Sequence, residues 1–405
     1  IIINAAQTYV GLKRSGAACD YQISGVSIRE LPGNHAYQPT TTSRPVLSAR
    51  YNLLTATDTF SAAAWLTSPA WSVDIGDAAP DNSATAIKIT SLTGNAAPNR
   101  VVTATSGAVT FLIYAKAGTH APAFLVRNNT TATPLVSSTT SIGSHSSSYG
   151  TGTTTDAGNG WRKVVVSITS GVTTGDNIGL YWGAQGAVPV GQYWWIWHPD
   201  FRATNDGVGL PDYQRVTDAN TYDTAGFPLY LKFDGVDDWM QTANVDFSGT
   251  DVVAIATAYR KMSDVSVGEV FALSGSPTAT AGTFGFYAPE AAGGVAAAVF
   301  FARGASSIIS GQRLGTAPIS CVAGGWASLS MPYMRYRINQ GVSLTSSVAT
   351  GGGNYGIYPL FIGRRNGTSF PFNGRLYSLL IRGAATPDTT IAKVERYLNQ
   401  KARIY

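Results

Sequence analysis

The sequence predicts an all-β fold of tandem β-sandwich (jelly-roll) modules with one short C-terminal helix. Charged residues make up only 13% of the 405 residues, about half of the ~25% that is usual in soluble domains. The chain also holds 44 glycines and 11% aromatic residues, and short runs of β-branched and aromatic residues recur between Gly, Asn and Pro. This composition excludes a long charged helix, a coiled coil and charge-driven disorder.

The strand signals fall into two sets along the chain. The first set covers residues 101–102, 109–114, 123–127 and 161–168. The second set covers residues 229–233, 252–259, 269–273, 283–287, 335–338, 359–362 and 376–382. Residues 128–160 are poor in apolar side chains and rich in Ser, Thr and Gly, so we expect long exposed loops there around at most one weak strand.

One segment, residues 386–401, has the pattern of a helix. It begins with Thr-Pro-Asp, which is typical of a helix N-terminus. Ile391, Val394 and Leu398 then follow at spacings of three and four residues, which makes one apolar stripe. We expect this helix to lie with that stripe against a larger β domain.

Several classes of function are disfavoured by charge and cysteine usage. The net charge of +5 is spread over the chain without a block of Lys or Arg, so no nucleic-acid partner is expected. No apolar run approaches ~18 residues, so no membrane insertion is expected. Cys19 and Cys321 fall in different predicted domains, which favours two free buried thiols over a disulfide.

Three segments are predicted. A strand that ends in Leu-Pro, followed by a Thr-rich connection, occurs near Leu31 and again near Leu210. Residues 1–50 are therefore interpreted as the C-terminal part of a preceding β module plus a linker, and 51–205 and 206–405 as two further modules. Because too few strands precede Leu31 to complete a sandwich, we expect the N-terminal segment to pair with a neighbouring module or another chain.

Residues 51–205 resemble the carbohydrate-binding-module-like jelly rolls of bacteriophage tail and fibre proteins. The resemblance is carried by the order and spacing of short motifs, at residues 51–54, 58–65, 158–166 and 193–197. It implies a jelly-roll fold and a virion context.

Residues 206–405 resemble a concanavalin A-like, laminin G-like sandwich. The motifs are Leu-Lys-Phe-Asp-Gly-Val-Asp-Asp at 231–238, Arg-Tyr-Arg-Ile-Asn-Gln-Gly at 335–341 and Leu-Phe-Ile-Gly-Arg at 360–364. The Asn-Gly-Arg strand at 373–381, followed by a helix, is typical of phage virion proteins of this type. The resemblance implies a virion protein, such as a tail fibre, appendage or decoration component, and establishes no sugar ligand.

The candidate ligand-binding residues are Tyr193, Trp195 and Trp197 in the run Tyr-Trp-Trp-Ile-Trp. Side chains alternate between the two faces of a strand, so these three share one face and Trp194 and Ile196 share the other. Three aromatic rings on one face suit a platform for stacking sugar rings. They equally suit a hydrophobic core or an interface between modules.

The acidic side chains give no catalytic site and no metal site. The run Asp-Gly-Val-Asp-Asp at 234–238 lacks the spacing and length of a calcium loop, and a glycine turn capped by aspartates explains it more simply. Glycoside hydrolysis needs two carboxylates roughly 5–10 Å apart. Among the scarce glutamates (Glu30, Glu269, Glu290 and Glu395), Glu395 lies on the helix and Glu269 starts a strand, with no carboxylate partner two residues away. We expect no cofactor and no enzymatic activity.

The sequence thus favours a non-enzymatic structural protein of a tailed bacteriophage virion that adheres to host surface glycans. Its expected partners are other virion proteins, further copies of itself and a cell-surface glycan. Two alternatives remain: a virion-borne or secreted polysaccharide-degrading enzyme, and a cellular carbohydrate-binding adhesin. A close carboxylate pair on one strand face would favour the enzyme.

Overall fold

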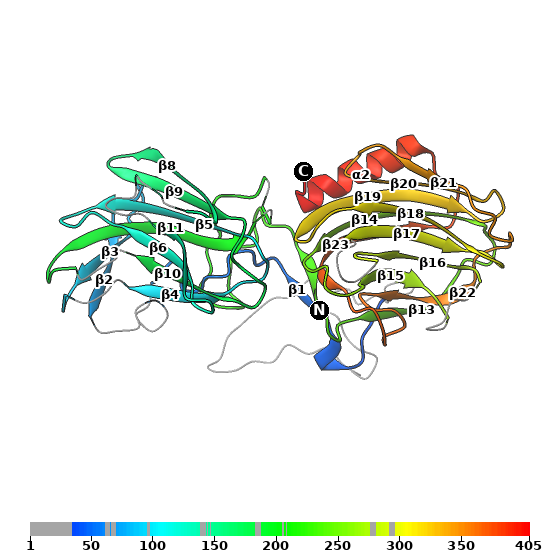
Figure 1. Cartoon of the computed structure of the whole chain (residues 1–405), viewed down its shortest axis with the longest axis horizontal. Helices are drawn as coiled ribbons and strands as arrows, with labels where there is room; N and C mark the ends of the chain where they lie inside the picture. Colours follow the sequence, from blue (N-terminus) through cyan, green and yellow to red (C-terminus); the bar gives the residue numbers. More distant parts are fainter. Residues whose placement is uncertain are drawn as a thin grey trace, which may run out of the picture. The chain divides into compact units, whose positions relative to one another are not determined.

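The all-β prediction is confirmed by the computed structural model, in which antiparallel strands form four sheets (Figure 1). The model describes residues 35–60, 65, 70–94, 98–137, 143, 145, 147–182, 188–204, 206, 207, 209–275, 281–290 and 296–405. Cys19 and the expected strands before Leu31 lie outside the described residues.

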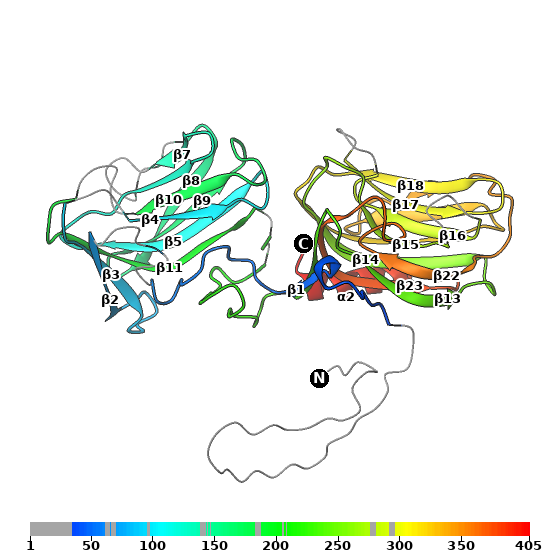
Figure 2. The ribbon, with the colours of Figure 1, turned by 90° about the horizontal axis from the view of Figure 1, so that it is seen from below.

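The first sandwich consists of a six-stranded and a four-stranded sheet (Figure 2). The six-stranded sheet has the order β2 (Trp71–Asp77), β3 (Ala86–Ser91), β11 (Tyr193–Ala203), β5 (Val109–Ala117), β9 (Trp161–Ile168) and β8 (Gly150–Gly158). The four-stranded sheet has the order β4 (Asn99–Thr103), β10 (Asn177–Trp182), β6 (Phe124–Asn128) and β7 (Thr133–Ser137). Alternate residues from both sheets, among them Phe111, Val164, Leu180 and Trp194, form one buried core.

The second sandwich consists of a seven-stranded and a six-stranded sheet. The seven-stranded sheet has the order β1 (Val46–Ser48), β12 (Tyr230–Asp234), β23 (Asn373–Arg382), β14 (Val252–Lys261), β19 (Ile319–Ser328), β20 (Tyr333–Ile338) and β21 (Leu344–Ser346). The six-stranded sheet has the order β13 (Met240–Asp246), β22 (Ile357–Ile362), β15 (Glu269–Leu273), β16 (Thr283–Tyr287), β17 (Ala297–Arg303) and β18 (Ile308–Leu314). A short 3₁₀ turn, η1 (Thr41–Ser43), precedes β1.

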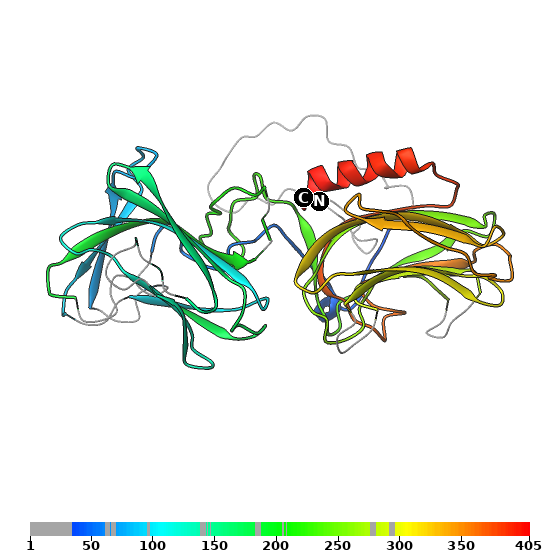
Figure 3. The same ribbon diagram turned by 45° about the horizontal axis from the view of Figure 1, so that its top comes forward.

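The helix α2 (Asp388–Ala402) covers the outer side of the seven-stranded sheet, where it contacts β14, β19 and β23 (Figure 3). Ile391 and Leu398 are buried and Val394 is partly buried against Ala256, Ala258 and Val322. The stripe predicted from the sequence therefore faces the sheet. Glu395 is also fully buried on this helix and forms an ion pair with Arg337 at 2.6 Å.

The expectation of at most one weak strand in residues 128–160 is wrong, because both β7 and β8 lie there. β8 is an edge strand of nine residues, and most of its side chains are exposed or partly exposed. Its register is set by backbone pairing with β9, from Gly150 opposite Ile168 to Gly158 opposite Trp161. An edge strand held mainly by its partner has no apolar alternation of its own.

The N-terminal part of the described chain belongs to the second sandwich. β1 pairs antiparallel with β12, with Val46 opposite Lys232 and Ser48 opposite Tyr230. The backbone of Tyr37 also exchanges two hydrogen bonds with that of Gln241. The pairing predicted for the apolar strands before Leu31 is a separate matter, because those strands lie outside the described residues.

Asp206 forms a buried charge cluster with the second sandwich. Its Oδ1 lies 2.7 Å from Nε of Arg260, and its Oδ2 lies 2.9 Å from Nη1 of Arg375. All three side chains are nearly inaccessible to solvent. The two guanidinium groups therefore depend on one carboxylate for charge neutralisation.

The structure also describes one of the two cysteines and the lengths of the helices. Cys321 is a free, buried thiol in the second core, and burial raises its pKa to about 11. Among the described residues, no helix is both long and apolar enough to cross a membrane.

Candidate functional site

On the side of the six-stranded sheet that faces away from the main core of the first sandwich, Trp161 and Trp197 form a small buried cluster, and Tyr114 and Trp195 pack against it. Tyr193, Trp195 and Trp197 all lie on this side. They alternate along β11 with Trp194 and Ile196, which are in the main core. Tyr114 of β5 pairs with Trp197 across the sheet and adds a fourth ring. We call this surface, formed by Tyr114, Tyr193, Trp195 and Trp197, the aromatic face.

Lysine side chains lie over three rings of the aromatic face. Nζ of Lys88 lies 4.4 Å from the ring centre of Tyr193, and Nζ of Lys116 lies 5.4 Å from that of Trp195. Lys163 lies 6.0 Å from the ring centre of Tyr114. Such cation–π contacts are weak at exposed sites, about 0.5–1 kcal/mol, and flexible lysine stems leave a ring at little cost.

The indole N–H groups of the aromatic face are paired. Nε1 of Trp195 donates to Asp77 at 2.7 Å, and Nε1 of Trp197 donates to Thr85 at 2.9 Å. These bonds fix the orientation of both indoles on the sheet. Tyr193 and Trp195 are partly exposed, with ring centres 5.1 Å apart.

Trp197 is the least accessible of the three predicted residues, at 6% exposure. The ring of His198 stacks on it at 3.3 Å, and Tyr213 stacks on the other side of His198 at 3.8 Å. Burial lowers the pKa of His198 to about 4, so this imidazole is neutral at pH 7. A ligand on this face therefore meets Tyr193, Trp195 and Tyr114 rather than Trp197.

The acidic run of the second sandwich brings Asp234, Asp237 and Asp238 within 4.8 Å of one another. Asp234 Oδ1 accepts from the amides of Val236 and Asp237, and Asp238 Oδ2 accepts from the amide of Asp234. Asp237 Oδ2 accepts from the hydroxyl of Ser43 at 2.8 Å. These are the bonds of a capped turn, as the sequence led us to expect.

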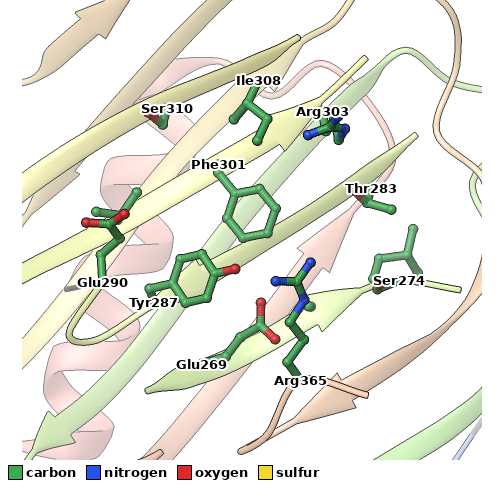
Figure 4. A pocket seen from close by; sticks show the side chains of 13 residues that line it. Glu269, Ser274, Thr283, Tyr287, Glu290, Phe301, Arg303, Ile308, Ser310 and Arg365 are labelled. Atoms are coloured by element: carbon green, nitrogen blue, oxygen red, sulfur yellow. The ribbon is translucent and has the colours of Figure 1, made fainter. Parts of the chain in front are cut away.

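A pocket of roughly 400 Å³ opens on the outer side of the six-stranded sheet of the second sandwich (Figure 4). Phe284, Phe286 and Phe300 point inward to the core, and the residues that alternate with them line the pocket. We call it the glutamate pocket because Glu269 and Glu290 both line it. Their spacing along the chain gave no sign of this arrangement.

The floor of the glutamate pocket is aromatic. The rings of Tyr287 and Phe301 stack at 5.1 Å with an interplanar angle of 18°. Phe301 reaches over Gly285, where an added Cβ would stand 2.7 Å from the ring. The missing side chain at this position therefore lets the ring lie close to the strand.

Glu269 is the buried acid of the pocket, at 1% exposure. Burial raises the pKa of its carboxyl to about 8, although Arg365 and the Tyr287 hydroxyl both act to lower it. Neither carboxyl oxygen has a partner in regular hydrogen-bond geometry. The group is therefore mostly neutral at pH 7, with the Tyr287 hydroxyl and the Arg365 guanidinium as its polar neighbours.

No family model and no curated protein matches the sequence. Several solved structures are similar, at low identity. They include the CBM40 of the Ruminococcus gnavus IT-sialidase bound to α2,3-sialyllactose, with 12% identity, a TM-score of 0.29, and coverage of 38% of this chain and 97% of that one. Domains LG4–5 of the mouse laminin α1 chain share 12% identity at a TM-score of 0.30, over 81% and 91% of the two chains.

A SAP-like pentraxin from Limulus polyphemus shares 11% identity at a TM-score of 0.32, over 40% of this chain and 80% of that one. At these scores the likenesses decide neither a ligand nor an assembly for this chain. The β-sandwich architecture rests on the strands and sheets described above.

Proposed function

We propose that this chain is a non-catalytic adhesive protein that binds glycans through the aromatic face of its first sandwich. The observation that supports it is the position of Tyr193 and Trp195, partly exposed on the side of a sheet that faces away from the main core, which Trp194 and Ile196 already help to fill. Aromatic residues outside a core are available for ligand contact. The C–H face of a sugar ring is apolar and packs against such rings, while its hydroxyl groups bond to flanking polar side chains.

The neighbours of these rings suit a hydroxylated ligand. Lys88 and Lys116 supply donors beside Tyr193 and Trp195. Asp77 supplies an acceptor next to the indole of Trp195. A sugar that displaces one lysine from its ring keeps that lysine within reach as a hydrogen-bond donor.

We further propose that the protein is a structural component of a tailed bacteriophage virion, such as a fibre, appendage or decoration. The motif resemblance of residues 51–205 and 206–405 and the low content of charged residues, 13%, support this. The strand β1 also supports assembly with another chain, because it is the outermost described strand of its sheet and its Val46 and Leu47 are 59% and 65% exposed.

The glycan proposal is tested with the full chain on an array of bacterial capsular polysaccharides and lipopolysaccharide O-chains. Trp195→Ala should weaken binding to any recognised glycan about fivefold or more, because stacking of a ligand ring on one aromatic side chain is worth on the order of 1–3 kcal/mol, the range found for nucleobases. Tyr397→Ala, at an exposed tyrosine of α2, is the matched control and should leave binding unchanged. Equal binding by wild type and Trp195→Ala would refute the assignment to this face.

The virion proposal is tested separately by proteomic analysis of density-purified particles from the source culture. Peptides of this chain should be present in a constant ratio to other tail or capsid proteins. Their absence from purified particles would reject the virion role. It would not affect the conclusion about glycan binding.

A further inference from the structure

The glutamate pocket has a charge pattern that the aromatic face lacks. Arg303 of β17 and Arg365, which follows β22, both line it. Among the described residues, neither guanidinium forms a salt bridge. Glu290 is exposed and lies on the far side of the Tyr287 ring from Arg365 (Figure 4). Two cations therefore face a pocket in which the buried acid is neutral at pH 7.

Arginine is the side chain best suited to bind a carboxylate. Its planar guanidinium offers two parallel N–H donors to the two carboxylate oxygens. The Arg365 side chain is held in place by the ring of Phe370, which lies 5.6 Å from its guanidinium carbon. Arg303 comes from a different element, β17, where it lies next to Thr283 and Ile308 of the neighbouring strands (Figure 4). The pocket thus offers a ligand carboxylate two guanidinium groups from different segments.

The remaining walls suit a ring that carries hydroxyl groups. The stacked rings of Tyr287 and Phe301 offer an apolar floor. The hydroxyl groups of Ser274, Thr283 and Ser310 line the pocket with them. A volume of roughly 400 Å³ is in the range of small-molecule sites, about 300–1,000 Å³.

The buried carboxyl group of Glu269 is a polar contact that the pocket can offer to a ligand. The carboxyl group, the Tyr287 hydroxyl and the Arg365 guanidinium point toward one another (Figure 4), yet both carboxyl oxygens remain without a regular hydrogen bond. A buried polar group without a regular hydrogen-bond partner costs free energy. A ligand hydroxyl that bonds to Glu269 would recover that free energy on binding.

We propose that the glutamate pocket binds a carboxylated sugar unit, a hexuronate, with its carboxylate on Arg303 or Arg365 and a hydroxyl group on Glu269. The site is separate from the aromatic face, and its residues all belong to the second sandwich. Hexuronate binding in this pocket therefore does not depend on whether the aromatic face binds glycans.

The test measures binding to the full chain by calorimetry or NMR, with methyl β-D-glucuronide as the probe and methyl β-D-glucoside as the neutral match. The glucuronide should bind at least tenfold more tightly. Arg303→Gln and Arg365→Gln should each be examined, and at least one should remove this preference. Arg382→Gln, at an exposed arginine of the other sheet, is the control and should leave it intact.

Equal affinity for the two methyl glycosides would overturn the proposal, as would a preference that survives both pocket substitutions. Because the arginines lie on different segments, misfolding of one variant leaves the other as the test. Trp195→Ala should not change glucuronide binding. A hyaluronan tetrasaccharide shows whether the pocket takes the unit within a chain: binding of the tetrasaccharide extends the proposal to polymers, and its failure confines the proposal to free or terminal sugar acids.

Glu269 gives a second, independent readout. The charged or titratable groups that act on it are Arg365 and Tyr287, and Arg303 and Glu290 line the same pocket without acting on it directly. Ionisation of Glu269 places a negative charge beside the ligand carboxylate, so glucuronide binding should weaken several-fold between pH 6 and pH 9. Glu269→Gln keeps a neutral hydrogen-bonding group and should remove this pH dependence. A pH dependence that persists in Glu269→Gln would exclude Glu269 as a ligand contact.

Discussion

The aromatic face and the glutamate pocket differ in how their polar groups are paired. On the aromatic face, the N–H groups of Trp195 and Trp197 already bond to Asp77 and Thr85. In the glutamate pocket, the carboxyl group of Glu269 is buried without a regular partner. The indole groups of the aromatic face therefore have regular partners without a ligand, whereas the carboxyl group in the pocket has only the irregular contacts of Tyr287 and Arg365.

This difference separates two kinds of recognition. Stacking on exposed rings depends little on which sugar is present, because every pyranose has an apolar face. A pocket with a buried acid and two arginines discriminates by charge, because a mismatched ligand leaves buried groups unpaired. We therefore expect the first sandwich to bind many different sugars weakly and the second sandwich to accept fewer kinds of sugar.

The largest expected effect tests whether the two sandwiches unfold separately. Asp206→Asn removes the shared counter-charge of Arg260 and Arg375, and breaking a buried ion pair costs ~3–5 kcal/mol. Denaturant unfolding followed by circular dichroism, which reports the strands of both sandwiches, should show this loss. Tryptophan fluorescence reports mainly the first sandwich, because seven of the nine tryptophans lie between residues 51 and 205.

The control is Asp212→Asn, whose ion pair with Lys163 is exposed and should contribute ~0–1 kcal/mol. If both signals shift together in Asp206→Asn, the sandwiches unfold as one unit. The aromatic face and the glutamate pocket would then belong to one cooperative folding unit.

Leu398→Ala should have the next largest effect, because α2 covers the sheet opposite the glutamate pocket. Leu398 is 1% exposed, and truncation of such a core leucine costs ~2–5 kcal/mol. Thermal or denaturant unfolding measures the loss, and Tyr397→Ala, at a 54% exposed neighbour, is the control. A negligible change in Leu398→Ala would mean that α2 is not docked on the sheet.

The pH dependence of stability isolates the buried acid of the pocket. The pKa of Glu269 is about 8 in the folded state and about 4.3 in an unfolded chain, so the unfolded state releases its proton first as pH rises. Stability from this group is present below pH ~4.3, falls as pH rises to ~8 and is then lost.

Glu269→Gln lacks this titration. The variant should match the wild type near pH 4 and exceed its free energy of unfolding by up to a few kcal/mol at pH 9. Denaturant unfolding of both proteins across this range measures the difference. A difference in the free energy of unfolding that is the same at all pH values would show that Glu269 titrates normally. The pocket would then hold no neutral buried acid at pH 7.

The smallest expected effect is catalytic. Glu290 is exposed, and its charge acts on Tyr287 rather than on Glu269, so the two glutamates are not arranged as an electrostatically coupled pair. Purified protein should release no reducing sugar from host polysaccharide. Steady turnover that is lost in both Glu269→Gln and Glu290→Gln would establish the enzyme alternative, and both faces would then be substrate contacts.

Sequence reasoning succeeded where a segment carries its own pattern. The predicted strands at 161–168, 269–273 and 283–287 agree with β9, β15 and β16 residue for residue. The alternation of Tyr193 and Trp195 with Trp194 also predicted which rings share a face. β8 was missed because its residues are mostly Thr and Gly, and its structure comes from pairing with β9.

The glutamate pocket was missed for a different reason. Glu269, Tyr287, Arg303 and Arg365 come from separate strands and a turn, and only the order of β22, β15, β16 and β17 in the sheet brings them together. No spacing along the chain records that order. The single available signal was a glutamate within a strongly apolar strand, where a charged side chain is costly.

The pairing of β1 with β12 also determines how the protein would carry mechanical load. The chain leaves β1 at Ser48, forms the whole first sandwich and returns to β12 at Tyr230, which lies opposite Ser48 in the sheet. A pulling force applied between residue 46 and residue 405 passes across the β1–β12 hydrogen bonds and bypasses the first sandwich. The aromatic face is thus carried on a side branch that stays unstretched until β1 is torn from the sheet, so a ligand held there would not be released by tension along the main path.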